Sequence, residues 1–77
     1  MKEKILEILL KIRPESDFKG SGDFISDDLL DSFDVIELVS CLEDEFGCVI
    51  DGLDILPQNF KSLEDIEGIV SRSGGTI

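Results

Sequence analysis

The chain has 77 residues, a formal net charge of -11, and no His, Trp or Tyr. Without His it can hold neither a Ser-His-Asp or Cys-His catalytic arrangement nor a His-ligated metal. Its negative charge argues against nucleic acid and against insertion into an anionic membrane surface, because both depend on Lys and Arg. A chain of this length predicts one domain, residues 1–77, with a small core and no sizeable enclosed pocket.

The first residues lead directly into a helical pattern, with no signal-peptide core and no apolar run long enough to span a bilayer. Cys41 and Cys48 match neither a CxxC site nor a disulfide framework. We therefore expect a cytoplasmic monomer with two reduced thiols.

Residues 2–13 predict a first helix, ended by Pro14. Residues 14–31 predict a long connection with a flexible point at 20–22 and a short helical turn near 27–30. The side chains expected to fix it to the core are Phe18, Phe24, Ile25, Leu29 and Leu30.

Residues 32–46 predict a second helix, with apolar residues at helical spacing and Gly47 as its end signal. Residues 54–60 can hold only a short helical turn, with Pro57 at its start. A capping-box pattern at 62–65 begins a last helix, and we expect 73–77 to be a frayed tail. The predicted fold is all-α, a small bundle of three main helices plus one short helix, with a long loop between the first two.

The acidic residues are concentrated in the middle of the chain. Between Gly20 and Phe60 there are 11 Asp and Glu residues and no Lys or Arg, so the net charge resides there. On a helical projection of residues 32–46, six side chains lie sideways or outward: Phe33, Ile36, Glu37, Ser40, Glu43 and Asp44. An apolar patch ringed by carboxylates suits a docking surface. The alternative is that Phe33 and Ile36 fold back into the core under the 14–31 loop.

Ser32 stands at the head of this second helix. One interpretation is structural, because serine is a favoured N-cap and Asp31 and Asp34 would complement the helix dipole. The chain has no base that could activate the hydroxyl, so a reaction at Ser32 would need one from another protein.

A resemblance to a known family offers a second interpretation of Ser32. The segment Leu29-Leu30-Asp31-Ser32-Phe33-Asp34, continued by Val35-Ile36-Glu37-Leu38-Val39 and Leu42-Glu43-Asp44-Glu45-Phe46-Gly47, resembles acyl carrier proteins. The resemblance extends over essentially the whole chain. It implies a carrier with no catalytic site of its own.

In such a carrier, a phosphopantetheinyl transferase would attach the 4'-phosphopantetheine of coenzyme A to Ser32. The arm would hold an acyl group as a thioester between partner enzymes of fatty acid, polyketide or related biosynthesis. The resemblance further implies that the transferase contacts Asp31. It implies that Glu37, Glu43 and Asp44 meet basic docking patches, and that Phe33 and Ile36 are apolar contacts.

Other interpretations stay open. Phe33 stands where the family usually has leucine, a change that also resembles D-alanyl carriers loaded by an adenylating ligase. A different class is an acidic helical interaction module in which Ser32 is a plain cap. A calcium site is a third interpretation, but the Asp-rich segments lack EF-hand ligand spacing, so we expect no dedicated metal site.

Overall fold

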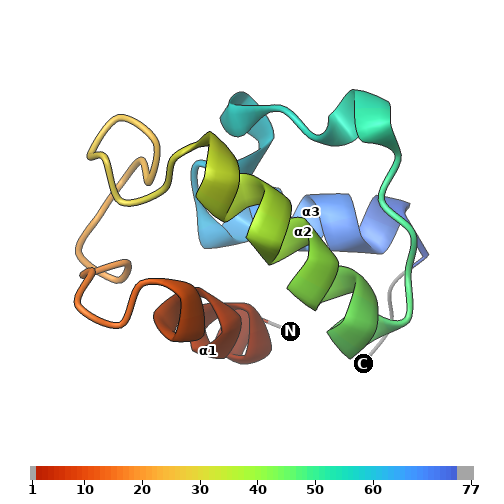
Figure 1. Ribbon diagram of the computed structural model, residues 1–77, viewed down its shortest axis with the longest axis horizontal. Coiled ribbons are helices and arrows are strands. Elements are labelled where there is room, and N and C mark those ends of the chain that lie inside the picture. The colour runs from red at the N-terminus through yellow and green to blue at the C-terminus, as the bar shows by residue number, and fades with distance from the viewer. Residues whose placement is uncertain (1, 75–77) are drawn as a thin grey trace.

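The computed structural model describes residues 2–74. It contains α1 (Lys2–Ile12), α2 (Ser32–Phe46) and α3 (Leu63–Arg72), with two short 3-10 helices, η1 (Gly52–Asp54) and η2 (Pro57–Phe60), before α3 (Figure 1). No strand occurs in the described part of the chain. The predicted all-helical class and its three main helices are therefore confirmed. Across residues 2–74, no helix has the length and apolar character needed to cross a membrane.

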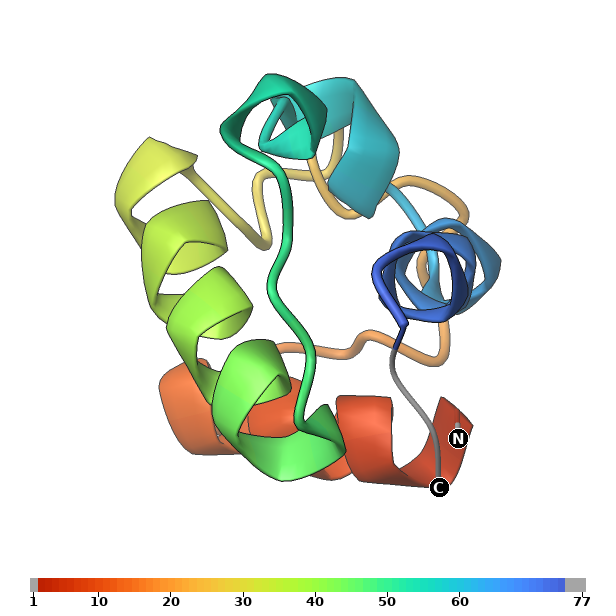
Figure 2. The same cartoon turned by 90° about the vertical axis from the view of Figure 1, so that its right-hand side faces the viewer.

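The elements enclose one hydrophobic core. α1 packs against both α2 and α3, and η2 contacts α3 and α2. Figure 2 shows α1, α2, η2 and α3 arranged around this shared interior. Side chains from each of them are fully buried: Ile5 and Leu9, Leu38 and Leu42, Phe60, and Ile66. Because the core uses one stripe of each helix, the opposite side of α2 remains available to solvent.

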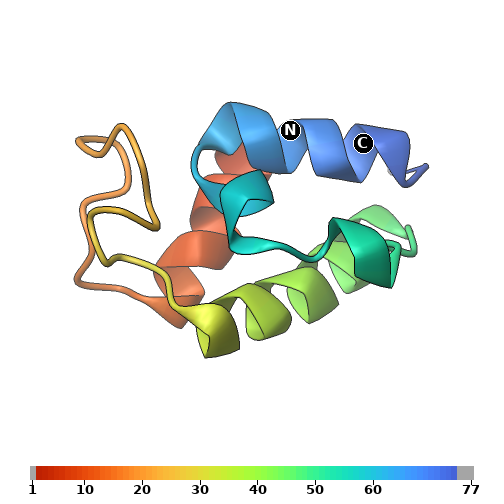
Figure 3. The same ribbon diagram turned by 90° about the horizontal axis from the view of Figure 1, so that it is seen from above.

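The 14–31 loop lies at one end of the molecule (Figure 3) and is fixed by aromatic packing. Phe18 and Phe24 are buried edge to face, with ring centroids 5.1 Å apart. The backbone N–H of Phe24 donates to the carbonyl of Lys61 at 2.7 Å, joining the loop to the segment before α3. Leu30 is also buried, while Ile25 and Leu29 pack more loosely against the core.

One local expectation needs correction, and another is refined. The turn expected near 27–30 begins earlier, because the Asp23 carboxylate accepts hydrogen bonds from the N–H groups of Ile25 and Ser26. The short helical turn expected at 54–60 is the 3-10 turn η2, and Pro57 is its first residue, as predicted. A second 3-10 turn, η1, precedes it and was not predicted. Leu56 between them is extended at φ -126° and ψ 141°, because Pro57 disfavours helical backbone at the residue before it.

The predicted end of α2 and the predicted start of α3 agree with the structure. α2 ends at Gly47, which has a left-handed φ of 62°, and the Ser62 hydroxyl caps α3 by accepting from the N–H of Asp65. Ser73 and Gly74 continue the last turn of α3 through backbone hydrogen bonds. The rest of the expected frayed tail, residues 75–77, lies outside the described residues.

Gly47→Ala should lower the free energy of unfolding by about 1 kcal/mol, because a Cβ makes left-handed backbone unfavourable. Nothing lies within 4 Å of the position a Cβ would take, so the cost is conformational and not steric. Urea unfolding measures it. Gly22→Ala is the control, since Gly22 also has open space but no positive φ. Equal effects of the two substitutions would contradict this explanation.

Candidate functional site

Ser32 is the first residue of α2, and its side chain is exposed. The N-cap is Asp31, one residue earlier. Asp31 Oδ1 accepts from the N–H of Asp34 at 2.9 Å, and Asp34 Oδ2 accepts from the N–H of Asp31 at 3.1 Å. This reciprocal capping box satisfies helix-start donors without the serine. The interpretation of Ser32 as a plain cap is therefore wrong, and its hydroxyl is left without a capping role.

A cation just after α1 completes the start of α2. Arg13 follows the last residue of α1. Its Nε donates to Asp34 Oδ2 at 2.9 Å, and its Nη2 lies 2.6 Å from the same oxygen as an ion pair. Its Nη2 also lies 3.3 Å from Asp31 Oδ2. Sequence reasoning missed this contact, because the partners are 18 and 21 residues away and nothing in the local pattern pairs them.

Asp34 is the only charged side chain buried in the described residues, at 8 % exposure. Burial by itself raises the pKa of its carboxyl group. The hydrogen bonds from Arg13 and from the Asp31 backbone outweigh burial, so the pKa of Asp34 lies below its ordinary value. Asp34 is therefore an ionised, paired group that stabilises the helix start, and it is not poised to act as a general acid near neutral pH.

The outer face of α2 carries the exposed apolar side chains. Phe33 is 83 % exposed and Ile36 is 62 % exposed, so the alternative that they fold under the 14–31 loop is wrong. Glu37, Ser40 and Asp44 are also exposed. Glu43 differs from them, because its carboxylate accepts a hydrogen bond from the N–H of Ile50 at 2.8 Å and so ties down the connector after α2.

An open cleft of about 200 Å³ lies beside Ser32. Its lining is almost wholly apolar and comes from α2 and from the segment around η2: Ser32, Val35, Ile36, Ile55 and Pro57. Two further leucines of that segment are solvent-accessible, Leu53 at 84 % and Leu56 at 41 %. The sequence analysis did not assign residues 53–57 to the site. The sequence did contain a sign of this surface, because residues 53–57 include several apolar side chains in a segment too short to bury all of them.

Cations of α1 and of the residue that follows it meet α2 at both of its ends. Arg13 pairs at the start, and Lys4 Nζ lies 3.4 Å from a carboxylate oxygen of Glu45 near the end. Between them, Glu37 and Asp44 form no ion pair with any described residue. The middle of the outer face therefore keeps its negative charge beside Ile36.

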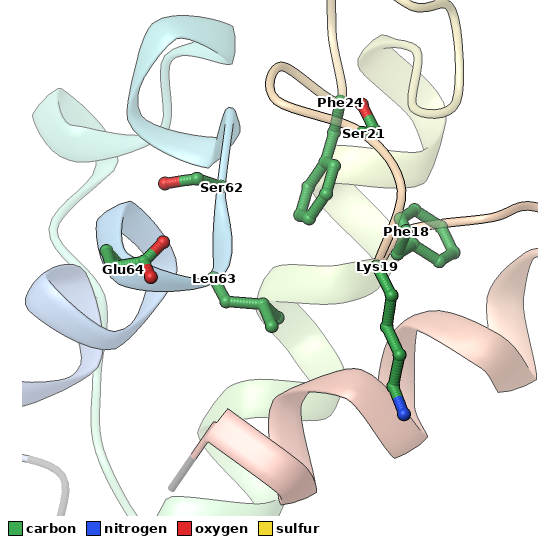
Figure 4. A pocket seen from close by; sticks show the side chains of 7 residues that line it. All are labelled: Phe18, Lys19, Ser21, Phe24, Ser62, Leu63 and Glu64. Carbon is green, nitrogen blue, oxygen red and sulfur yellow. The ribbon is translucent and has the colours of Figure 1, made fainter.

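A larger pocket of about 270 Å³ opens between the 14–31 loop and the start of α3 (Figure 4). The pocket residues are Phe18, Lys19, Ser21, Phe24, Ser62, Leu63 and Glu64. Several of its polar groups have partners: Ser62 caps α3, Ser21 donates to Asp27, and Glu64 pairs with Lys2 at 3.4 Å. This pocket offers no converging free polar groups, so the cleft at Ser32 is the better candidate.

The remaining reactive groups are two thiols and the carboxylates. Cys48 is buried, and burial, followed by the charge of Glu43, raises the pKa of its thiol. Cys41 is half-buried. No group of three or more His, Cys, Asp or Glu side chains within residues 2–74 is arranged to hold a metal ion.

Comparisons of the chain with protein-family models, with curated proteins and with solved structures found no match.

Ser32→Ala should change the free energy of unfolding by less than about 0.5 kcal/mol, because the side chain is exposed and does not cap α2. Asp31→Ala should cost about 1 kcal/mol or more, because it removes the cap. Chemical denaturation of both variants checks the difference. A larger loss in Ser32→Ala than in Asp31→Ala would contradict the assignment of the cap.

The contribution of Asp34 to stability should depend on pH. Because its folded-state pKa is lowered, the contribution is fully present above the unfolded pKa of about 3.9 and is lost as pH falls through the folded value. The stability difference between the parent and Asp34→Asn should therefore shrink below about pH 4. Urea unfolding across this range measures it. Asp44→Asn, which removes a charge from exposed α2 surface, is the control, and a pH-independent difference for Asp34→Asn would refute the prediction.

Proposed function

We propose that this protein is an acyl carrier whose 4'-phosphopantetheine arm is attached to the hydroxyl of Ser32. The observation that carries the proposal is the exposed Ser32 hydroxyl at the head of α2, with capping performed by Asp31. A serine in this place is accessible to another protein, and its substitution removes no fold-forming contact. The motif around it, Asp31-Ser32-Phe33-Asp34, is the one that resembles acyl carrier proteins.

The surroundings of Ser32 support a docking role. Phe33 and Ile36 offer apolar contact area within the first turns of α2, and Glu37 and Asp44 supply negative charge. A basic partner would be attracted by these carboxylates, which raises association rates more than affinity. Such fast and weak binding suits a protein that visits several enzymes in turn.

The attachment reaction balances without a catalytic group from this chain. The Ser32 oxygen forms a bond to the phosphorus that carries the pantetheine, and the pyrophosphate bond of coenzyme A breaks. Adenosine 3',5'-bisphosphate leaves, and the serine proton passes to a base of the transferase. The attached arm then supplies a terminal thiol that can carry an acyl group as a thioester. The apolar cleft beside Ser32 offers a surface against which a short apolar segment can pack.

The alternative cargo is an aminoacyl group, such as the D-alanyl group suggested by Phe33. The proposed partners are the transferase, a loading ligase and downstream synthase enzymes with basic docking patches. The rival proposal, an acidic interaction module, loses the cap that it assigned to Ser32 and so has no role for this residue.

Incubation with coenzyme A, magnesium and a broad-specificity phosphopantetheinyl transferase should add the mass of one phosphopantetheine to the parent protein. Ser32→Ala should gain no mass, although it keeps its fold. Ser71→Ala is the matched control, since Ser71 is an exposed helical serine on α3, and it should be modified like the parent. Intact-mass spectrometry with circular dichroism measures both properties. An unmodified but folded parent would refute the proposal and favour the interaction module.

A further inference from the structure

The guanidinium of Arg13 is the only positively charged group that reaches the carboxylates on both sides of Ser32 in the described part of the chain. It contacts Asp34 through two nitrogens at 2.9 and 2.6 Å and Asp31 through one at 3.3 Å. Asp34 Oδ2 additionally accepts from the N–H of Asp31. The first turn of α2 is therefore held by three side chains, of which one comes from the residue that follows α1.

The cation is needed because of how the capping box is built. Two carboxylates face each other across the helix start, and that of Asp34 is mostly shielded from water. Like charges at this spacing repel, and a buried charge without a partner is costly. Arg13 removes both penalties, so the two carboxylates can accept each other's backbone N–H groups. Asp31 then has both oxygens engaged, Oδ1 with the Asp34 N–H and Oδ2 with Arg13.

Ser32 lies between the two residues that Arg13 holds, although Arg13 does not contact it. We propose that Arg13 is a positioning residue for Ser32, which it acts on through Asp31 and Asp34 by fixing the first turn of α2. This inference rests on the proposed attachment of the arm to Ser32. Asp31 then has two roles. It caps α2 while Arg13 holds its carboxylate in place, and it remains available for contact with a transferase.

The positioning role and a simple charge effect predict opposite results. Loss of the Arg13 charge makes the chain one unit more negative, which strengthens attraction to a basic transferase and lowers KM or leaves it unchanged. Loss of positioning leaves the Ser32 hydroxyl less well oriented for transfer, which lowers kcat. A fall in kcat without a rise in KM is therefore the signature of positioning.

The experiment compares Arg13→Gln with Lys11→Gln, using the transferase, coenzyme A and magnesium. Lys11 is an exposed cation in the last turn of α1, two residues before Arg13, and no ion pair among residues 2–74 includes it. The two variants have the same net charge. We expect kcat to fall roughly tenfold in Arg13→Gln, since small misplacements of a reacting group can cost up to about 100-fold. Lys11→Gln should keep the parental kcat.

A structural measurement that needs no transferase accompanies the kinetics. Amide hydrogen exchange at Asp34 and Val35, whose N–H groups bond to Asp31, should become faster in Arg13→Gln and not in Lys11→Gln. Exchange in α3 should be the same in all proteins. Arg13→Lys replaces Arg13→Gln if the latter does not fold, because it keeps the charge but lacks the paired nitrogens. Its kcat should be lower than those of the parent and of Lys11→Gln.

The outcomes separate the two proposals. If the parent is modified and Arg13→Gln or Arg13→Lys is modified with the kcat of Lys11→Gln, the positioning role is overturned while the carrier function stands. If the folded parent gains no arm, the proposed function fails and the positioning role fails with it. A selective fall in kcat together with faster exchange at the start of α2 supports the role assigned to Arg13.

Discussion

The start of α2 depends on one cation that belongs to another part of the chain. The single positive charge of Arg13 offsets the repulsion between two carboxylates at the place where the helix begins. With the cation present, the same carboxylates become reciprocal caps, and burial of Asp34 becomes tolerable. The two ends of the long 14–31 loop are then joined by this ion pair, and the middle of the loop is held by the hydrogen bond from the Phe24 N–H to the Lys61 carbonyl. These contacts hold the start of α2 in place, and the exposed Ser32 and the apolar outer face lie on this helix.

Much of this architecture could be predicted from local pattern. The bounds of α2 follow from helical spacing and from Gly47, and the buried loop residues Phe18, Phe24 and Leu30 follow from their apolar character. The residue that caps α2 was harder to predict. Serine and aspartate are both favoured caps, and they are adjacent here, so propensity alone could not decide between Ser32 and Asp31.

What escaped prediction depends on contacts between distant segments. Arg13 gave no local sign of its partners, because charge pairing across a loop requires the three-dimensional path of that loop. The cleft beside Ser32 likewise needs Ile55 and Pro57 to be brought against α2 from the far side of the connector. The exposure of Phe33 and Ile36 could not be decided from periodicity either, because a long loop near the helix start offered them a possible cover. The structure places that loop elsewhere and leaves both side chains open to solvent.

The burial of Cys48 has a consequence for a protein proposed to hold its cargo as a thioester. Thioesters pass their acyl group to thiolates, and a thiolate forms only when a thiol can lose its proton. The low-dielectric surroundings of Cys48 and the neighbouring Glu43 charge both oppose that loss. In the proposed carrier, the core position of this sulfur would therefore make Cys48 a poor acceptor for an acyl group held on the arm.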